Sequence, residues 1–506
     1  MKTTTLALGA LLTFLAQAFD PVCLQANDFV LATGNPSLQV WRAGATQLPV
    51  WSLSGRQPGQ SVAAVTPPMP AGCRAVRVEI LVVNTDGRAS SGFTDVYRVL
   101  VTQLRDGQAL KDGVLDGKPV RSELAAPGVV RAVVLESYAL VEPGVSLAVR
   151  LARLPDDAGD TFEEPAGLVQ MKLTPLAAPP AASLVEDAPG YNSWPMIQNV
   201  GDRLVCTYSR GSGHTIHEGS RSAYARCSVD GGRTWTPEVC FAQDPQVGEV
   251  MIGKGLDNDG AALFWVRCLG RPKSHHDLYR TRDGVAFEKI AEPALDPFPM
   301  QITDVVKTPA GLMSLWFATN YQEDGTHSWG TLTSTDNGRT WTQKTVETVA
   351  KKGELPTEQS FVHLGGGRLL GIARTENGGD ATAAQFQLTS LDCGKTWKKV
   401  RTNIRDVLIS TPSLVYDEKT GLLSNYYYER GRGPIKRRVA RPDDVFDHPL
   451  RWPAPETVAI GEWNRPWDSG NASAIGMGDR HYVAYYSGNP SNAVVLVASP
   501  QAPARR

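Results

Sequence analysis

Two side chains beyond residue 190 combine a type suited to proton transfer with a local sequence that favours contact with a ligand. Glu358 follows Pro356-Thr357, where we expect a strand to begin, and its carboxylate can act as an acid, a base or the ion-pair partner of an arginine. His214 lies in a glycine-flanked loop, and an imidazole suits proton transfer near neutral pH. The alternative for His214 is a loop residue that only forms hydrogen bonds with a ligand.

The overall charge argues against one broad class of ligand. The sequence contains 51 Lys and Arg against 52 Asp and Glu, a net charge of −1, and so lacks the global basic surface typical of nucleic-acid binding. An anionic ligand would need a local cluster of cations instead. Two groups of basic residues could line a groove for a polyanion, although such residues more often form a solvated face: Lys254, Arg267, Arg271 and Lys273, and residues 436–438.

A metal site is not expected from the sequence. The segment His275-His276-Asp277 suggests one, but adjacent side chains of a strand point to opposite faces, so the two histidines cannot easily share an ion. We therefore predict neither a metal nor a cofactor.

The N-terminal part is predicted to comprise a signal peptide, residues 1–18, and an accessory β-sandwich, residues 19–175. Lys2, an apolar run and Ala16-Gln-Ala18 form the pattern of a cleaved secretory signal, so we expect a secreted or periplasmic protein. Short alternating runs between turn residues predict the sandwich, which could bind carbohydrate. Residues 176–190 are rich in Pro and Ala and predict a linker. No other run reaches the 18 apolar residues of a membrane helix.

An internal repeat predicts the architecture of residues 191–506. The pattern Ser-x-Asp-x-Gly-x-Thr-Trp occurs with its aspartate at Asp230, Asp336 and Asp392, and a degenerate copy contains Asp283. A period near 50 residues, with a strand on each side of a turn, is typical of propeller blades, and the span holds about six periods. The aspartates build hairpin turns and are therefore structural. The predicted fold is all-β, a six-bladed β-propeller preceded by a β-sandwich.

These repeats are Asp boxes, and the domain resembles the sialidase superfamily of six-bladed propellers. Further segments resemble the catalytic propeller of phage endosialidases, which cut α-2,8-linked polysialic acid internally. They fall between about 185 and 500: YNSWPMI (191–197), YSRGSGH (208–214), HSWGTLTSTDNGRTWTQ (327–343), PTEQS (356–360), GIARTE (371–376), STPSLVYD (410–417) and YYYERGRGPIKRR (426–438). Residues 19–175 do not match the head-binding part of the phage enzymes, and their trimerising stalk has no counterpart, so we predict no oligomeric state.

The resemblance implies how an acidic sugar is bound. Exo-sialidases hold the sugar carboxylate with three arginines, and the first is absent here because its segment reads Asn192-Ser-Trp-Pro. The second corresponds to Arg374 and the third to Arg430, with Arg432 as the competitor. A guanidinium suits this role because it binds a carboxylate with two parallel hydrogen bonds. The alternative for these arginines is a surface charge at a strand end.

Aromatic side chains are also implied in substrate binding. Tyr191 and Trp194 match aromatic positions of the endosialidase site and are expected to pack on the apolar face of the sugar, unless they serve only in propeller packing. Arg210, in the neighbouring segment, is expected to contact the substrate as well.

The resemblance implies an endo-acting glycoside hydrolase of sialic acid or a related 2-keto acid sugar in an acidic polysaccharide. The tyrosine nucleophile of retaining exo-sialidases is missing from Ser469-Gly-Asn-Ala-Ser, so an inverting attack by water is implied, assisted by Glu358 and His214. Inverting sites separate their two groups by about 6.5–9.5 Å. His217 and Glu218 are reserve candidates. The alternatives are an exo-acting hydrolase of terminal 2-keto-3-deoxy sugar acids and a non-catalytic lectin.

Overall fold

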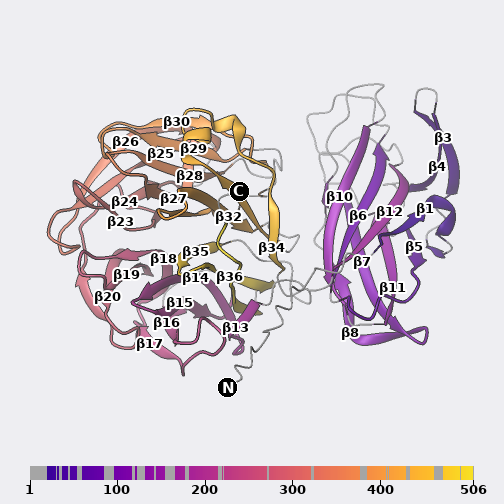
Figure 1. Ribbon diagram of the computed structural model, residues 1–506, viewed down its shortest axis with the longest axis horizontal. Coiled ribbons are helices and arrows are strands. Elements are labelled where there is room, and N and C mark those ends of the chain that lie inside the picture. The colour runs from indigo at the N-terminus through magenta and orange to yellow at the C-terminus, as the bar shows by residue number, and fades with distance from the viewer. Residues whose placement is uncertain are drawn as a thin grey trace, which may run out of the picture. The chain divides into compact units, whose positions relative to one another are not determined.

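The structure is a computed structural model, and it confirms the predicted all-β class, because nearly all the regular secondary structure of the described residues is strand (Figure 1). The chain divides into two compact units, Met1–Val114 with Val120–Ala178, and Leu115–Pro119 with Pro179–Arg506, here called unit 1 and unit 2. The structure describes residues 20–504 except 30, 34–36, 44–45, 54–59, 74, 85–95, 117–119, 122–130, 142–143, 154–165, 177–181, 215–218, 220, 271–272, 321–323, 377–383, 406, 408–409, 429–433, 461–470 and 490–491. The predicted signal peptide lies outside these residues.

Unit 1 contains two antiparallel sheets of six strands. Alternate residues such as Val76 and Val78 are buried, which explains the alternating sequence pattern of this region. The first sheet has the order β10-β6-β12-β4-β3, with β1 on β12: β1 (Val22–Gln25), β3 (Ser37–Ala43), β4 (Thr46–Leu53), β6 (Ala75–Asn84), β10 (Arg131–Leu140) and β12 (Ala166–Leu176). The second has the order β2-β5-β11-β7-β8, with β9 on β7: β2 (Leu31–Thr33), β5 (Ser61–Val65), β7 (Val96–Arg105), β8 (Gln108–Asp116), β9 (Val120–Arg121) and β11 (Ser146–Arg153).

In the sheets of unit 2, most neighbouring strands are antiparallel and consecutive in the sequence. The largest has the order β17-β16-β15-β14-β37-β36-β35, with β13 on β37: β13 (Ala182–Glu186), β14 (Tyr191–Val200), β15 (Arg203–Gly211), β16 (Arg221–Ser228), β17 (Val239–Ala242), β35 (Ala472–Met477), β36 (Arg480–Asn489) and β37 (Asn492–Ala498). The next has the order β18-β19-β20-β21: β18 (Val247–Leu256), β19 (Ala262–Gly270), β20 (His275–Thr281) and β21 (Glu288–Ala291).

Three further sheets complete unit 2. One has the order β22-β24-β25-β26, with β23 on β24: β22 (Gln301–Ile302), β23 (Val306–Thr308), β24 (Gly311–Ala318), β25 (Asp324–Ser334) and β26 (Thr342–Lys351). The others run β27-β28-β29-β30 and β31-β32-β33-β34: β27 (Pro356–His363), β28 (Leu369–Thr375), β29 (Phe386–Ser390), β30 (Lys398–Arg401), β31 (Ser413–Asp417), β32 (Leu422–Tyr428), β33 (Pro434–Ala440) and β34 (Glu456–Ile460).

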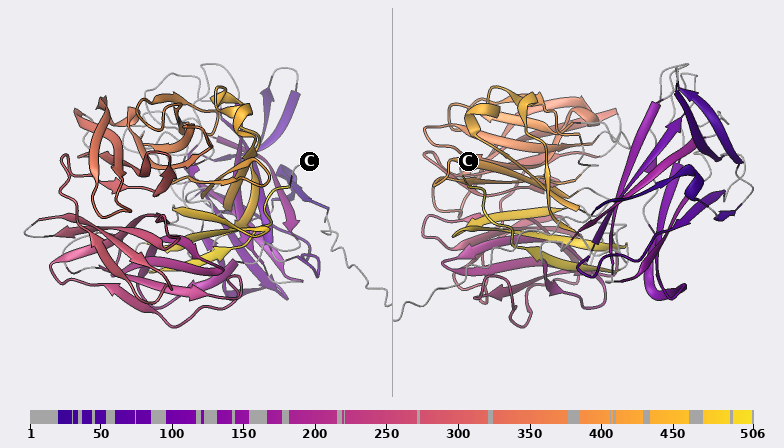
Figure 2. Two further views of the ribbon diagram at one scale, coloured as in Figure 1. Left: turned by 60° about the vertical axis from the view of Figure 1, so that its left-hand side comes forward. Right: turned by 45° about the vertical axis from the view of Figure 1, so that its right-hand side comes forward.

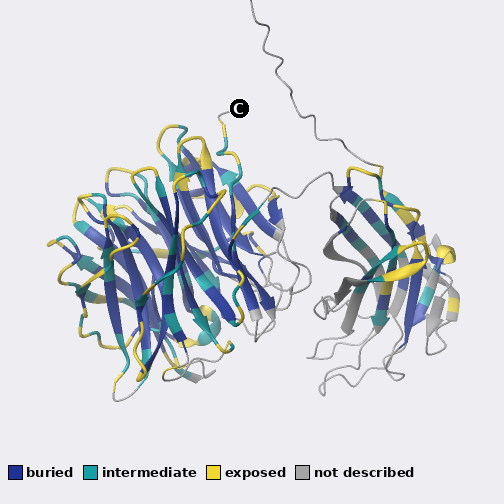
Figure 3. Ribbon diagram, turned by 90° about the horizontal axis from the view of Figure 1, so that it is seen from below, coloured by how far each residue is buried: buried dark blue, intermediate teal, exposed yellow. Residues whose placement is uncertain are grey.

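The first strands of successive sheets of unit 2 contact one another in a closed ring. β14 contacts β18, β18 contacts β22 and β23, β23 and β24 contact β27, β27 contacts β31, β31 contacts β35, and β35 returns to β14 (Figure 2). The strands are mostly buried and the turns exposed (Figure 3). The ring therefore brings residues that are far apart in the sequence to one central region.

The ring closes through strands from both ends of unit 2. β13 pairs with β37, although it lies inside the predicted linker 176–190, so that prediction is wrong for residues 182–186. The Pro- and Ala-rich composition concealed the strand, whose residues Val185 and Glu186 are buried. β14 adds a single parallel partnership with β37, between Tyr191 and Ala493.

The repeated turns are held by their aspartates, as the sequence predicts. In the second copy, Asp336 accepts hydrogen bonds from Ser334 Oγ at 2.8 Å and Thr340 Oγ1 at 2.6 Å. These donors, the threonine hydroxyl above all, lower the pKa of Asp336 to about 2. Trp341 then packs against Trp265 of the preceding sheet, with ring centroids 5.2 Å apart.

In the part of the chain that the structure describes, helical structure is confined to short turns: η1 (Ala26–Asp28), η2 (Lys352–Glu354), α1 (Pro442–Val445) and η3 (Pro449–Arg451). Within the described residues, no helix has the length and apolar character needed to cross a membrane.

Candidate active site

A cavity of about 390 Å³ lies in unit 2 and brings together most of the described residues that the sequence singles out. Its lining comes from four of the five sheets of unit 2 and from the loops beside them. The lining residues are Trp194, His214, Val250, Met251, Ile252, Arg267, Leu269, Met300, Gln301, Phe317, Glu358, Arg374, Asn471 and Tyr486.

Glu358 and Trp194 enter this cavity from irregular points of the inner strands. The register of β27 with β28 shifts between Thr357 and Ser360, and that of β14 with β15 shifts between Ser193 and Met196. Within these bulges Glu358 has φ of 45° and Trp194 has φ of 49°, in the left-handed region. Such backbone costs an L-residue free energy, and bulges redirect side chains beside functional sites. The conformation therefore points to a functional demand on both residues.

The Glu358 carboxylate is bound on both of its oxygens. Oε1 accepts a hydrogen bond from Arg374 Nη1 at 2.7 Å, and Oε2 accepts one from Thr411 Oγ1. Thr411 Oγ1 also lies 3.1 Å from Asn471 Oδ1. The side chain of Glu358 is 14% exposed, so the carboxylate is fixed in place yet open to the cavity.

Arg374 is held between two carboxylates. It lies on β28, opposite Thr357 in the pairing with β27, and its Nη2 contacts Glu376 Oε1 at 2.7 Å while Nη1 binds Glu358. The second carboxylate is itself bound by Thr357 Oγ1 at 3.0 Å. These contacts orient the guanidinium at the cavity wall.

His214 is exposed and contacts the buried side chain of Tyr191. Its Nδ1 is 2.7 Å from the hydroxyl of Tyr191, and its ring lies 5.6 Å from that of Trp194. The structure corrects the expectation that Tyr191 packs on a sugar, because Tyr191 is fully buried and does not line the cavity. Tyr191 instead positions His214, whereas Trp194 remains available to a ligand.

Arg221 contacts both Trp194 and the backbone around Tyr191 and His214. Its guanidinium lies 4.5 Å from the ring centre of Trp194, and it donates hydrogen bonds to the Tyr191 carbonyl at 3.2 Å and to the Gly213 carbonyl, next to His214. Burial lowers the pKa of Arg221 to about 10. One cation thus links the bulge at Trp194 to the loop that carries His214.

Arg267 is a cavity residue for which sequence analysis predicts only a general place in a basic groove. It lies on β19, is buried, and binds the Met300 carbonyl through Nη1. With Arg374 it provides two guanidinium groups at the cavity wall, while Glu358 in the lining and Glu376 just outside it supply two carboxylates, so these four charges balance. The guanidinium groups themselves, and not a net positive charge, suit an acidic ligand.

Tyr486 and Asn471 also line the cavity, and no sequence argument identified their roles. The hydroxyl of Tyr486 is 3.4 Å from that of Tyr191. Asn471 lies in the segment Ser469-Gly-Asn-Ala-Ser that the resemblance singled out for its missing tyrosine, so the position itself was the available signal.

Several predicted residues are not brought to the cavity. Arg210 was expected to contact substrate, but its guanidinium binds Glu186 at 2.8 Å, Glu238 and Asn192, and it stacks on Tyr224. This ion-pair network explains why the expectation fails.

Two predicted arginines, Arg430 and Arg432, and the reserve candidates His217 and Glu218 lie outside the described residues. The basic residues of β33 are buried: Arg437 binds Glu456 at 2.8 Å, and Arg438 binds the Tyr427 hydroxyl at 2.9 Å. These contacts support the fold, and Arg437 also lines a separate cavity of about 740 Å³ together with Arg441 and Arg451.

Comparison with family models and with curated proteins finds no match. Among solved structures, the sialidase NanB, determined with Optactamide, is similar with a TM-score of 0.51 at 11% identity, over 90% of this chain and 98% of that chain. A protein of unknown function from Dyadobacter fermentans has a TM-score of 0.49 at 17% identity, over 64% of this chain and 99% of that one. Trypanosoma rangeli sialidase in complex with sialic acid has a TM-score of 0.46 at 13% identity, over 63% of this chain and 56% of that chain. The likeness to NanB shows a sialidase-like, β-propeller-like fold.

Proposed function

We propose that this protein is a glycoside hydrolase that cleaves linkages of sialic acid or a related 2-keto acid sugar inside an acidic polysaccharide such as polysialic acid. The observation that carries the proposal is the pair Glu358 and Arg374, in contact at 2.7 Å on the wall of a cavity that Arg267 also lines. The strained backbone at Glu358 supports it, since an ordinary ion pair needs no such conformation.

The pairing of these two residues suits the chemistry of the substrate. A sialic acid carries its carboxylate on the anomeric carbon, where the glycosidic bond is broken. A sugar carboxylate bound by Arg374 therefore brings the reacting carbon next to Glu358. Arg267 provides a second guanidinium from the same cavity, and we propose Arg430 or Arg432 as a further carboxylate ligand.

We propose an inverting reaction in which Glu358 and His214 share the proton transfers. One group takes a proton from the attacking water, and the other donates a proton to the leaving oxygen. Tyr191 holds His214 through the contact of its hydroxyl with Nδ1. Asn471 supports this mechanism, because an amide at this position cannot serve as the nucleophile of a retaining enzyme.

Digestion of α-2,8-linked polysialic acid tests the activity. We expect a ladder of internal fragments, loss of turnover in Glu358→Gln and Arg374→Lys, and full turnover in the control Glu288→Gln, whose side chain is 66% exposed and pairs with Arg280. NMR of the first-formed anomer should show inversion. Release of monosaccharide alone would favour the exo-acting alternative. Binding without turnover would favour a lectin, and retention that is lost in Tyr486→Phe would identify Tyr486 as a nucleophile.

We also propose how the two units serve this activity. The eight-stranded sheet of unit 2 divides into β14 to β17 and β35 to β37 with β13, which with the other four sheets makes a six-bladed propeller. Unit 1 is proposed as an accessory β-sandwich that binds carbohydrate, and residues 1–18 as a signal for secretion or transfer to the periplasm. NMR titration of the protein with carbohydrates tests whether unit 1 binds them. N-terminal sequencing of the exported protein tests the signal.

A further inference from the structure

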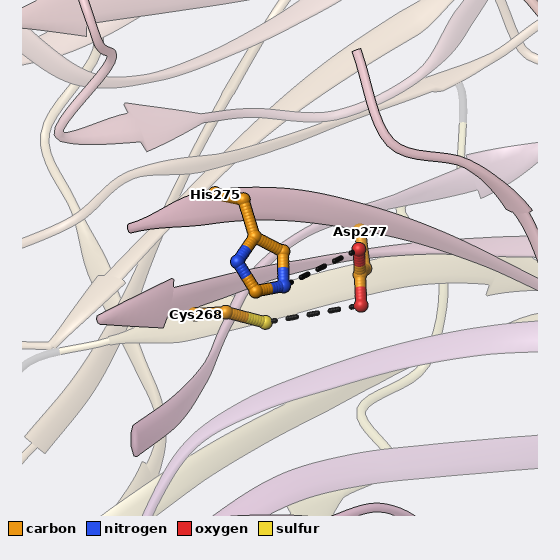
Figure 4. A group of neighbouring side chains, drawn as sticks. All are labelled: Cys268, His275 and Asp277. Carbon is orange, nitrogen blue, oxygen red and sulfur yellow. Dashed lines mark hydrogen bonds and ion pairs between the residues drawn. The ribbon is translucent and has the colours of Figure 1, made fainter. Parts of the chain in front are cut away.

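Three side chains of β19 and β20 converge on one face of their sheet. Cys268 on β19 is the register partner of His275 on β20, and Asp277 follows two residues later, so all three leave the sheet on the same side. Figure 4 shows the thiol, the imidazole and the carboxylate turned toward one another. His276 points to the other face and packs on Phe298, with ring centres 4.5 Å apart, so the two histidines do not share an ion, as predicted. His275 and Asp277, two residues apart, do lie on one face.

The distances within this cluster fit a metal ion. His275 Nε2 is 3.7 Å from Asp277 Oδ1, Cys268 Sγ is 3.9 Å from Asp277 Oδ2, and one ligand atom from each residue lies within 4.8 Å of the others. Tetrahedral zinc with bonds of about 2.0–2.3 Å places its ligands roughly 3.3–3.6 Å apart. Small movements of the side chains would therefore complete the site.

A second buried carboxylate faces the same region. Glu249 on β18 is the register partner of Cys268, so its side chain emerges on the same face. It is 2% exposed, and its Oε2 accepts no hydrogen bond from the residues that the structure describes. An orphaned buried oxygen is costly unless a cation or water satisfies it.

One side-chain cation already lies beside the cluster. The ammonium of Lys289 lies 3.5 Å from Asp277 Oδ1, but its side chain is 45% exposed and binds Glu292 at 3.0 Å. Lys289 therefore has another partner when an ion enters.

We propose that Cys268, His275 and Asp277 bind one zinc ion, with a water as the fourth ligand and Glu249 accepting a hydrogen bond from that water. A thiolate and an imidazole beside a carboxylate suit zinc, whereas magnesium and calcium prefer oxygen ligands. On binding, the Cys268 thiol loses its proton to solvent and a zinc–sulfur bond forms, with no change of oxidation state.

The zinc site would lie on the face of β19 opposite to the cavity and could affect the cavity through this strand. Arg267 and Leu269, on either side of Cys268, point to the opposite face of β19 and line the cavity. An ion that ties β19 to β20 would fix the strand that carries Arg267. The inference stands apart from the proposed function, because metal binding is measured without any substrate.

The full-length protein, stripped with a chelator and dialysed against zinc, provides the test. We expect one zinc ion per chain and a higher melting temperature, and cobalt in place of zinc should give a thiolate-to-cobalt charge-transfer band and tetrahedral d–d bands. His275→Gln changes a partly exposed side chain and should fold while losing at least tenfold in zinc affinity. Cys268→Ser should also abolish the charge-transfer band. His448→Gln and Cys23→Ser, at exposed residues, should leave binding intact.

Two results would overturn the proposal. One is zinc binding with the same stoichiometry and affinity in His275→Gln and Cys268→Ser, since the ion would then lie elsewhere. The other is a folded parent protein that takes up no zinc above background.

Discussion

The left-handed backbone at Glu358 predicts an unusual order of stability among variants at this position. In Glu358→Ala and Glu358→Gly, the contacts of the carboxylate with Arg374 and Thr411 are lost equally. The two variants then differ in the free energy needed to place alanine or glycine in the backbone conformation with φ of 45°. We expect the glycine variant to be the more stable of the two, and both to lack hydrolase activity.

The size of the effect follows from two opposing contributions. A left-handed conformation costs an L-residue about 1–2 kcal/mol, and glycine escapes this cost. Glycine loses about 0.5–1 kcal/mol more backbone entropy on folding than alanine. The net difference favours Glu358→Gly by about 0.5–1 kcal/mol. At His363, on the same strand but without positive φ, the entropy cost acts alone and should favour alanine by about 0.5–1 kcal/mol.

Calorimetry of the full-length variants can resolve this reversal. At about 2 °C per kcal/mol for a large domain, the glycine variant should melt about 1–2 °C higher at position 358 and about 1–2 °C lower at position 363. The unfolding transition of unit 2 is the one to compare, because a chain of two units need not unfold in one step. If alanine is favoured at both positions by the same amount, the strain assigned to Glu358 does not exist and the structural argument for its functional role fails.

Three further predictions concern single contacts. Tyr191→Phe removes the hydroxyl that holds His214 Nδ1, so kcat on polysialic acid should fall about tenfold while KM stays near that of the parent; unchanged kcat would remove His214 from the mechanism. Burial lowers the pKa of His481 to about 4, below its value of 6.5 in the unfolded chain. The unfolded chain therefore binds the extra proton, and the free energy of unfolding falls as the pH falls from about 6.5 to 4. Denaturant unfolding of His481→Gln across this pH range should show a smaller fall in that free energy. Asp336→Ala removes the hydrogen bonds of a repeated turn and should lower stability by about 1 kcal/mol, measured by thermal melting, with KM unaltered because the turn lies away from the cavity.

The local sequence was sufficient to predict the class of the fold and its repeated turns. Period-2 alternation gives half-buried strands, and in each repeated turn a serine, an aspartate and a threonine satisfy one another within a few residues. Such contacts are encoded locally. The pairing of β13 with β37 is not, because it joins segments more than 300 residues apart in a region whose composition suggests a linker.

The same distinction holds for the candidate site. Glu358 and Arg374 were found through short motifs, and the structure brings both to one cavity. The burial of Tyr191 and the ion pairs of Arg210 depend on neighbours that the local sequence does not reveal. For Cys268, His275 and Asp277, the missing information was the register of β19 with β20.

The irregularities of the inner strands explain how a regular ring can carry an asymmetric site. β14, β18 and β27 each contain a register shift at the level of the cavity, at Trp194, Ile252 and Glu358. In a regular strand, alternate side chains point into the packed space between sheets, and few are free to face the ring centre. A bulge turns one side chain out of this alternation at a local cost in backbone energy. The buried sheets on either side can offset that cost, so the three bulges bring Trp194, Ile252 and Glu358 to the cavity beside lining residues from regular strand positions.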